Sequence, residues 1–136
     1  MMQRQITLPN DIETIPQLNE FIDAAAEEIG LDMALTMSLN LALEEAVVNV
    51  MEYAYPPATE GQVDILLTAD EKMLTVVISD SGTPFDPTKQ AEADTTLSAE
   101  ERPIGGLGIH LVRQIMDNIS YQRSNGRNIL TLTKHL

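Results

Sequence analysis

The spacing of apolar residues separates helical from strand-like segments along the chain. Between positions 33 and 54 apolar residues recur at intervals of about three to four, which is the period of a helix with one buried face. That face consists of Leu39, Leu43, Ala46, Val47, Val50 and Ala54. Pro56 and Pro57 follow directly and end the helix. This segment, Met33–Ala54, therefore predicts a helix that packs against the core.

Shorter patterns on both sides predict the remaining elements. Gln3–Leu8 alternates weakly and predicts an edge strand, and a helix follows from Asn10 or Asp11 to about Ile29, where Gly30 stops it. After the central helix come strands at 62–68 and 73–79, a long loop at 83–103, a helix opened by residues 105–108, and strands around 119–122 and 128–133. The last helix carries an apolar stripe made of Ile109, Val112, Ile115, Met116 and Ile119.

This order of elements predicts an α+β fold. The turns at 69–72 and 124–126 join neighbouring strands into hairpins, so we expect a mixed, mostly antiparallel sheet. Helices joined to such a sheet must share one of its faces, which gives a two-layer sandwich. A loop as long as 83–103 is typical of lids and binding segments in compact domains.

Composition adds limits on domain number and location. A chain of 136 residues with 43% hydrophobic content fits one domain, residues 1–136. The absence of cysteine excludes disulfides and thiolate metal sites and fits a reducing compartment. The N-terminal segment lacks the apolar core of a signal peptide, and no stretch reaches the roughly 18 apolar residues of a membrane span. We expect a cytoplasmic protein.

Charge limits the partners. A net charge of −13 opposes direct binding to nucleic acids or anionic membranes. Arg4 is the single basic residue in positions 1–71, so an anionic ligand would have to find its cations later in the chain. Those in the last part are Arg102, Arg113, Arg123, Arg127 and Lys134.

Two polar residues of the central helix are the first candidates for chemistry. Glu45 and Asn49 are four residues apart and share a helix face. A carboxylate and an amide oxygen one turn apart can activate a hydroxyl and hold Mg²⁺, which prefers oxygen ligands. A solvated polar face is the alternative.

Two glycine-containing motifs supply further candidates. Asp80, at the end of a strand in the stretch DSGTPFDP, can accept a hydrogen bond from an exocyclic amine, and Gly82 leaves room for a flat base. Residues 105–108, Gly-Gly-Leu-Gly, precede a helix, where free N–H groups can hold phosphate. The alternatives are a capped turn and a flexible hinge.

Together these motifs resemble those of a known superfamily, the GHKL (Bergerat-fold) ATPases, and within it the small anti-sigma-factor serine/threonine protein kinases. The resemblance covers nearly the whole chain. The matching stretches are Glu45–Asn49 followed by Tyr53-Ala54-Tyr55, Asp80–Asp86, and Gly105–Ile109 with Leu111.

The resemblance implies a Bergerat fold with an ATP lid at about 83–104 and a role for each matched residue. Glu45 would be the general base, and Asn49 would bind Mg²⁺. Asp80 would recognise the adenine amine of ATP, with Gly82 and Phe85 beside it at the start of the lid. The second glycine motif would hold phosphate through its backbone, and the resemblance implies nucleotide contacts for Gly105, Gly106, Leu107, Gly108 and Ile109.

Three further positions carry less of the resemblance. Arg102, at the end of the lid, is the candidate for a cation that stabilises the transferred phosphoryl group. Asn128 stands near the adenine where relatives often have Thr, and Tyr53 stands where they often have His.

The resemblance implies a partner-switching regulator that phosphorylates a STAS-type anti-anti-sigma protein and acts on a sigma factor or beside a PP2C-type phosphatase, as a homodimer. One alternative is a nucleotide-gated binding module with little or no kinase activity, although the retained Glu45 favours a kinase. The other is a detached histidine-kinase ATPase domain, which is disfavoured because no dimerisation helix with a phosphoacceptor His is found.

Overall fold

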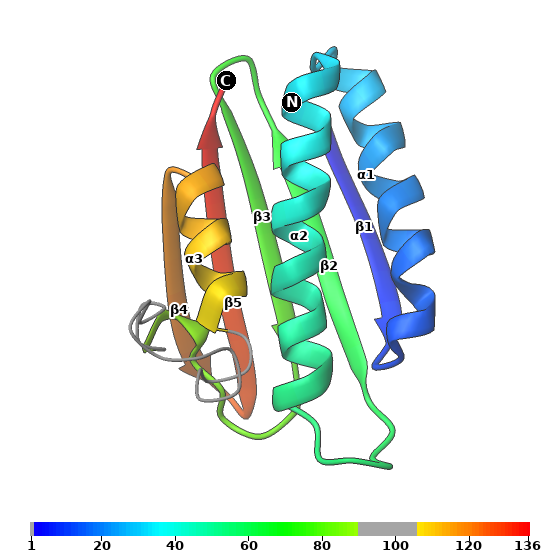
Figure 1. The fold of residues 1–136 in the computed structure, drawn as a ribbon, viewed down its shortest axis with the longest axis vertical. Coiled ribbons are helices and arrows are strands. Elements are labelled where there is room, and N and C mark those ends of the chain that lie inside the picture. Colours follow the sequence, from blue (N-terminus) through cyan, green and yellow to red (C-terminus); the bar gives the residue numbers. More distant parts are fainter. Residues whose placement is uncertain (1, 90–105) are drawn as a thin grey trace.

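The computed structural model describes residues 2–89 and 106–136, which form one sheet covered by helices (Figure 1). The expected helices and strands are all present, with ends that differ by a few residues. In chain order the elements are β1 (Met2–Pro9), α1 (Ile15–Ile29), α2 (Met33–Tyr53), β2 (Gln62–Ala69), β3 (Met73–Asp80), α3 (Gly106–Ile115), β4 (Asn118–Ser124) and β5 (Arg127–His135), with short 3₁₀ turns at Ile12–Thr14 and Pro87–Lys89.

The five strands form one sheet in the order β1-β2-β3-β5-β4. All four pairings are antiparallel, so the sheet contains no parallel pair where we expected a mixed one. The three helices of the described residues lie on the same face of this sheet (Figure 1). The predicted α+β two-layer sandwich is therefore confirmed.

The core lies between that face and the helices. In β2 and β3 every second residue is buried, as expected for strands covered on one side. All six residues predicted for the buried face of α2 are buried. Gly30 ends α1 in the left-handed conformation, with φ of 77°, as its position after the apolar pattern indicated.

The end of α3 differs from the prediction. The helix stops at Ile115, and Ile119 lies on β4 instead of continuing the helical stripe. The stripe itself is correct for Ile109, Val112 and Met116, which are buried. β4 begins at Asn118, only three residues after the end of α3. An apolar residue of the strand can therefore fall at the spacing expected for the helix.

The expected lid is described only at its start. Residues 83–89 include a short 3₁₀ turn in which the Asp86 carboxylate accepts hydrogen bonds from the backbone and hydroxyl of Thr88. Arg113 of α3 donates to the Thr88 carbonyl, so this first part is held against the domain. The rest of the predicted lid lies outside the described residues. No helix in the described ranges is long and apolar enough to cross a membrane.

Two leucines of α2 test this packing with the same substitution. Leu43 is fully buried, whereas Leu41 is largely exposed. We expect Leu43→Ala to lower the free energy of unfolding by about 2–5 kcal/mol through lost burial and a cavity. Leu41→Ala should change it by no more than about 0.5 kcal/mol. Urea unfolding followed by circular dichroism measures both, and equal losses would show that α2 faces the core differently.

Candidate functional site

The carboxylate of Asp80 is buried at the end of β3. Only 1% of Asp80 is exposed, and its Oδ1 accepts hydrogen bonds from the Gly82 amide at 2.8 Å and from Asn128 Nδ2 at 2.9 Å. Its Oδ2 is buried and has no partner among the described residues. Burial raises the pKa of Asp80, against the opposing effect of the hydrogen bonds from Asn128 and Gly82. A buried acceptor without a donor is costly, so this oxygen is suited to a ligand N–H.

Asn128 holds this carboxylate in place. It stands opposite Asp80 in the β3–β5 register and is buried. Its Nδ2 also donates to the Thr83 carbonyl at 2.8 Å, while its Oδ1 accepts from the Phe85 amide at 3.1 Å and from the Tyr121 hydroxyl. The protein itself thus uses both donors and the acceptor oxygen of this amide. Asn128 therefore orients Asp80 and residues 83–85. Its expected contact with a nucleotide stays a prediction.

Gly82 is required by backbone packing. A Cβ at this position would lie 2.3 Å from the carbonyl oxygen of Ala54. The same oxygen accepts hydrogen bonds from the Thr83 amide at 2.7 Å and its hydroxyl at 3.0 Å. The turn after β3 therefore fits closely against the end of α2. This contact gives Gly82 a structural reason, and the expected approach of a flat base to this position stays a prediction.

Aromatic residues at the end of α2 complete this junction. The Tyr55 hydroxyl donates to the Gln62 carbonyl at 2.7 Å and accepts from the Ser81 amide at 3.2 Å, which ties α2 to β2 and β3. The rings of Tyr53 and Phe85 pack with centroids 5.6 Å apart. The sequence predicted no role for Tyr55, although a tyrosine just before Pro56 marks the helix end.

Glu45 and Asn49 lie within α2, as predicted. Glu45 is partly buried, and Asn49 is 6% exposed. An asparagine in a helix interior is a poor helix former, and its burial costs free energy unless its amide is used. The buried amide therefore favours a function over the alternative of a solvated polar face.

The second glycine motif begins α3. Gly106, Leu107 and Gly108 form the first turn of this helix, where backbone N–H groups lack helical partners and the helix dipole favours anions. Ile109 is buried in the core cluster, so its side chain contributes to packing, and the nucleotide contact that the resemblance implies for this position stays a prediction. Gly105 and Arg102 lie outside the described residues.

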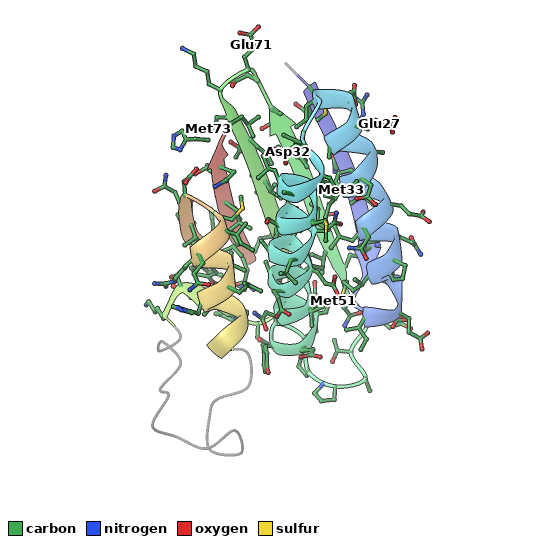
Figure 2. The ribbon with its side chains drawn as sticks, turned by 45° about the horizontal axis from the view of Figure 1, so that its top comes forward. Glu27, Asp32, Met33, Met51, Glu71 and Met73 are labelled. Atoms are coloured by element: carbon green, nitrogen blue, oxygen red, sulfur yellow. The ribbon has the colours of Figure 1, made fainter. Side chains whose placement is uncertain are left out.

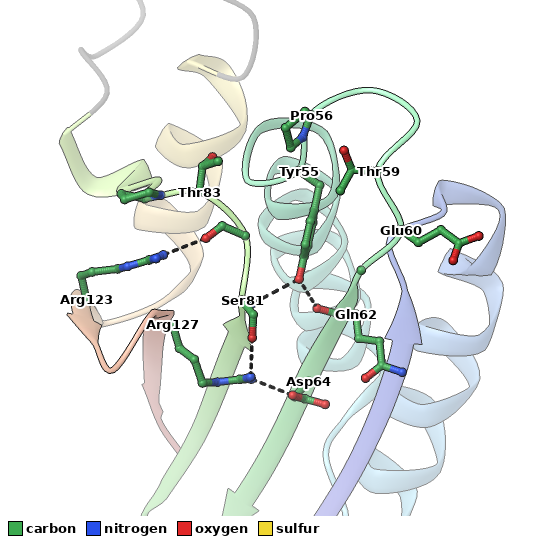
Figure 3. A pocket seen from close by; sticks show the side chains of 13 residues that line it. Tyr55, Pro56, Thr59, Glu60, Gln62, Asp64, Ser81, Thr83, Arg123 and Arg127 are labelled. Atoms are coloured by element: carbon green, nitrogen blue, oxygen red, sulfur yellow. Dashed lines mark hydrogen bonds and ion pairs between the residues drawn. The ribbon is translucent and has the colours of Figure 1, made fainter.

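The arginines of the last hairpin have partners in the protein. Arg127 donates to Asp64 at 2.7 Å and to Ser81 at 2.8 Å, and Arg123 donates to the Gly82 carbonyl at 2.9 Å (Figure 3). These residues line a cavity of about 670 Å³. Arg127 also donates to Ser79, outside the cavity lining, at 3.1 Å. Asp64 and Arg127 extend from the sheet face opposite to Asp80, and neither Glu45 nor Asn49 lines the cavity. The expected availability of Arg127 for an anionic ligand is therefore limited by its carboxylate partner.

Comparison with known families agrees with this arrangement. The model of the histidine kinase-like ATPase domain matches residues 8–134. The chain belongs to this family. Its membership confirms the GHKL-type fold and the resemblance inferred from the Glu45, Asp80 and Gly106 motifs.

Several curated relatives of this ATPase-family chain are named protein kinases. It is 33% identical over 101 residues to the serine/threonine-protein kinase BtrW of Bordetella bronchiseptica, covering 74% of this chain and 71% of BtrW. It is 29% identical over 119 residues to the serine-protein kinase RsbW of Listeria monocytogenes, covering 85% of this chain and 75% of RsbW.

Solved structures show the same fold. The crystal structure of the RsbU and RsbW domains of Rv1364c from Mycobacterium tuberculosis superposes with a TM-score of 0.70 at 16% identity, covering 98% of this ATPase-family chain and 32% of the other. A histidine kinase domain from Erythrobacter litoralis EL346 superposes with a TM-score of 0.54 at 15% identity, covering 88% of this chain and 59% of the other.

The raised pKa of Asp80 makes stability depend on pH. Because the folded protein holds this proton more tightly than the unfolded chain, the stabilisation is fully present below the unfolded pKa, about 3.9, and is lost as pH rises through the folded pKa. Asp80→Asn keeps an acceptor at Oδ1 and does not titrate. We expect the free energy of unfolding of the wild type, relative to this variant, to fall with rising pH in that window. Urea unfolding at a series of pH values measures the difference, which would stay flat if Asp80 were well solvated and its pKa were the same in the folded and unfolded states.

Proposed function

We propose that this chain is an ATP-dependent protein serine/threonine kinase of a partner-switching system. The observation that carries the proposal is the buried, unpartnered Oδ2 of Asp80 at the β3 end, in a chain that also keeps Glu45 on α2. The kinase names of relatives such as BtrW and RsbW support the activity.

The adenine end of the site would be formed at β3. Asp80 Oδ2 would accept a hydrogen bond from the exocyclic amine of adenine. The ionised carboxylate offers this acceptor, and its Oδ1 already accepts hydrogen bonds from Asn128 and Gly82. A protonated Asp80 or a guanine carbonyl would not satisfy this pairing. The site therefore favours adenine, which has an amine at C6, over guanine, which has a carbonyl there.

The phosphate end would be formed by α2 and α3. The Asn49 amide oxygen would bind Mg²⁺, and the backbone N–H groups of Gly106–Gly108 would bind phosphate oxygens. The described residues contain no group of three or more His, Cys, Asp or Glu side chains suited to a metal. Mg²⁺ often takes few protein ligands and shares substrate phosphates. Arg102 would add a cation from the lid. When bound, Mg-ATP supplies the phosphoryl group.

Glu45 would act on the attacking hydroxyl. Its carboxylate would accept the proton of a serine or threonine hydroxyl of the partner protein, one turn of α2 before Asn49. Phosphoryl transfer depends mainly on positioning and charge stabilisation, so one base beside the phosphate-binding groups is a sufficient set of parts. A pure binding module would not need this base.

The partner would be a STAS-type anti-anti-sigma protein, whose phosphorylation changes its association with this kinase. A sigma factor or a PP2C-type phosphatase would be the other member of the system. The Mycobacterium tuberculosis chain joins RsbU and RsbW domains in one polypeptide. We further propose that the active form is a homodimer in the cytoplasm.

Nucleotide binding is tested by thermal unfolding with and without Mg-ATP. At a ligand concentration of a hundred times the dissociation constant we expect about 2.7 kcal/mol of added stability in the wild type. Asp80→Asn should lose most of this gain, because an amide NH₂ would face the adenine amine. Mg-GTP serves as the control nucleotide and should stabilise much less. Equal stabilisation of the wild type and the variant would remove Asp80 from the site.

Catalysis is tested by a matched pair of glutamates on α2. We expect Glu45→Gln to keep the Mg-ATP-dependent stabilisation and to lower phosphoryl transfer by about 10²- to 10⁴-fold, the usual contribution of a general base. Glu44→Gln, one residue away, should leave the transfer rate nearly unchanged. The measurement is the rate of phosphate incorporation into a STAS-domain protein from the same organism. Retained transfer in Glu45→Gln would favour another base, and no transfer in the wild type would favour the nucleotide-gated binding module.

A further inference from the structure

The N-terminal half of α2 exposes a row of large apolar side chains. Met33 is 79% exposed, Met37 66% and Leu41 46%. They recur every four residues, so they lie along one side of the helix. Figure 2 shows Met33 at the start of α2, on the outer side of the helix layer. We call these three residues the methionine ridge. Exposed apolar residues that adjoin one another often mark a protein interaction site, whereas single exposed apolar residues are ordinary.

Shallow grooves border the ridge between α1 and α2. One of about 730 Å³ includes Met37 and Leu41, and another of about 470 Å³ includes Met33 and Met37. Asp23 and Asn40 line both. The Asn40 amide donates to Asp23 Oδ1 at 2.8 Å and accepts from Asn19 Nδ2 at 3.0 Å. These hydrogen bonds join α1 to α2 between the two grooves and hold the helices together there.

The surroundings of the ridge are acidic. Neither α1 nor α2 contains a lysine, arginine or histidine. The grooves are lined by the carboxylates of Asp23, Glu27 and Glu44, and Asp32 caps the start of α2. Arg4 on β1 is already paired with Glu28 at 2.7 Å. The ridge is therefore an apolar strip within a field of uncompensated negative charge.

We propose that the methionine ridge is a docking site for a basic amphipathic helix of a partner protein. The apolar face of such a helix would lie on Met33, Met37 and Leu41, and its lysines or arginines would meet the flanking carboxylates. Methionine suits this use because its flexible side chain adapts to the packing of a partner.

A second copy of this chain fits the ridge poorly. A two-fold contact through the ridge would place the acidic rim of one copy against the same rim of the other. Like charges across an interface cost free energy, and this chain carries a net charge of −13. A basic partner meets no such repulsion.

The docking site does not depend on the proposed kinase activity. Its three apolar residues lie in the first half of α2, whereas Glu45 and Asn49 lie in the second half of the same helix. The inference therefore stands or falls on binding to the ridge, whatever the fate of the nucleotide site.

The test is a fluorescence-anisotropy titration of the full chain with two labelled peptides. The first is a helix of about 18 leucine and lysine residues with the leucines on one face, and the second has the same composition in an order that gives no apolar face. At about 0.15 M salt, where surface charges are largely screened, we expect the amphipathic peptide to bind at least about tenfold more tightly.

Variants of the chain identify the residues to which the peptide binds. Met37→Ser combined with Leu41→Ser should weaken the amphipathic peptide about tenfold, and Met33→Ser alone should weaken it less. Glu27→Gln with Glu44→Gln should weaken binding and reduce its dependence on salt. Ile12→Ser is the matched control, because Ile12 is also an exposed apolar residue, 52% exposed, but lies outside both grooves. Circular dichroism checks that each variant is folded.

Two outcomes would overturn the proposal. Equal affinity for both peptides, or unchanged affinity in the ridge variants, would show that the acidic surface binds cations without using the ridge. Dimers in sedimentation velocity that dissociate in Met37→Ser with Leu41→Ser would show that a second copy occupies the ridge.

Discussion

The hydrogen bond between the Asp80 carboxylate and the Asn128 amide fixes the geometry on which the candidate site depends. The two residues face each other across β3 and β5 and are both buried, so the bond operates away from competing water. Asn128 also binds Thr83 and Phe85 through its remaining groups, which ties the start of the segment after β3 to the sheet. One amide thus orients the carboxylate, leaves its second oxygen free and directs the chain that leaves the strand.

α2 links the core, the candidate catalytic residues and the surface. Its buried face packs on the sheet, and Gly82 lets the turn after β3 approach the Ala54 carbonyl at its end. Tyr55 continues this connection to β2 and β3. Because the buried face of α2 packs on the core from Leu39 onward, the sheet and the helix together place Glu45 and Asn49 relative to the β3 end. The helix presents the methionine ridge on its exposed side.

The positions of helices and strands were predictable from the sequence, because buried apolar residues recur about every 3.6 residues in a helix and every second residue in a strand. The face of α2 that contains Leu43 and Val47, the C-terminal stop at Gly30 and the hairpin turn at 124–126 follow from local chemistry. Ile119 was misplaced because an apolar residue just beyond a helix continues the helical pattern equally well from the next strand. The family was also predictable, since its motifs occur in order, and the match over residues 8–134 confirms it.

Local sequence patterns were enough to predict which elements form and which motifs place the chain in the histidine kinase-like ATPase family. They could not determine the use made of side chains whose partners lie far along the chain. Gly82 packs against the end of α2, and the Asn128 amide donates a hydrogen bond to Asp80. Arg127 forms an ion pair with Asp64. Folding brings these distant groups together. The exposed row of α2 also follows from packing. Spacing predicted the row that the sheet covers, but only the arrangement of α1, α2 and the sheet shows that Met33, Met37 and Leu41 stay exposed.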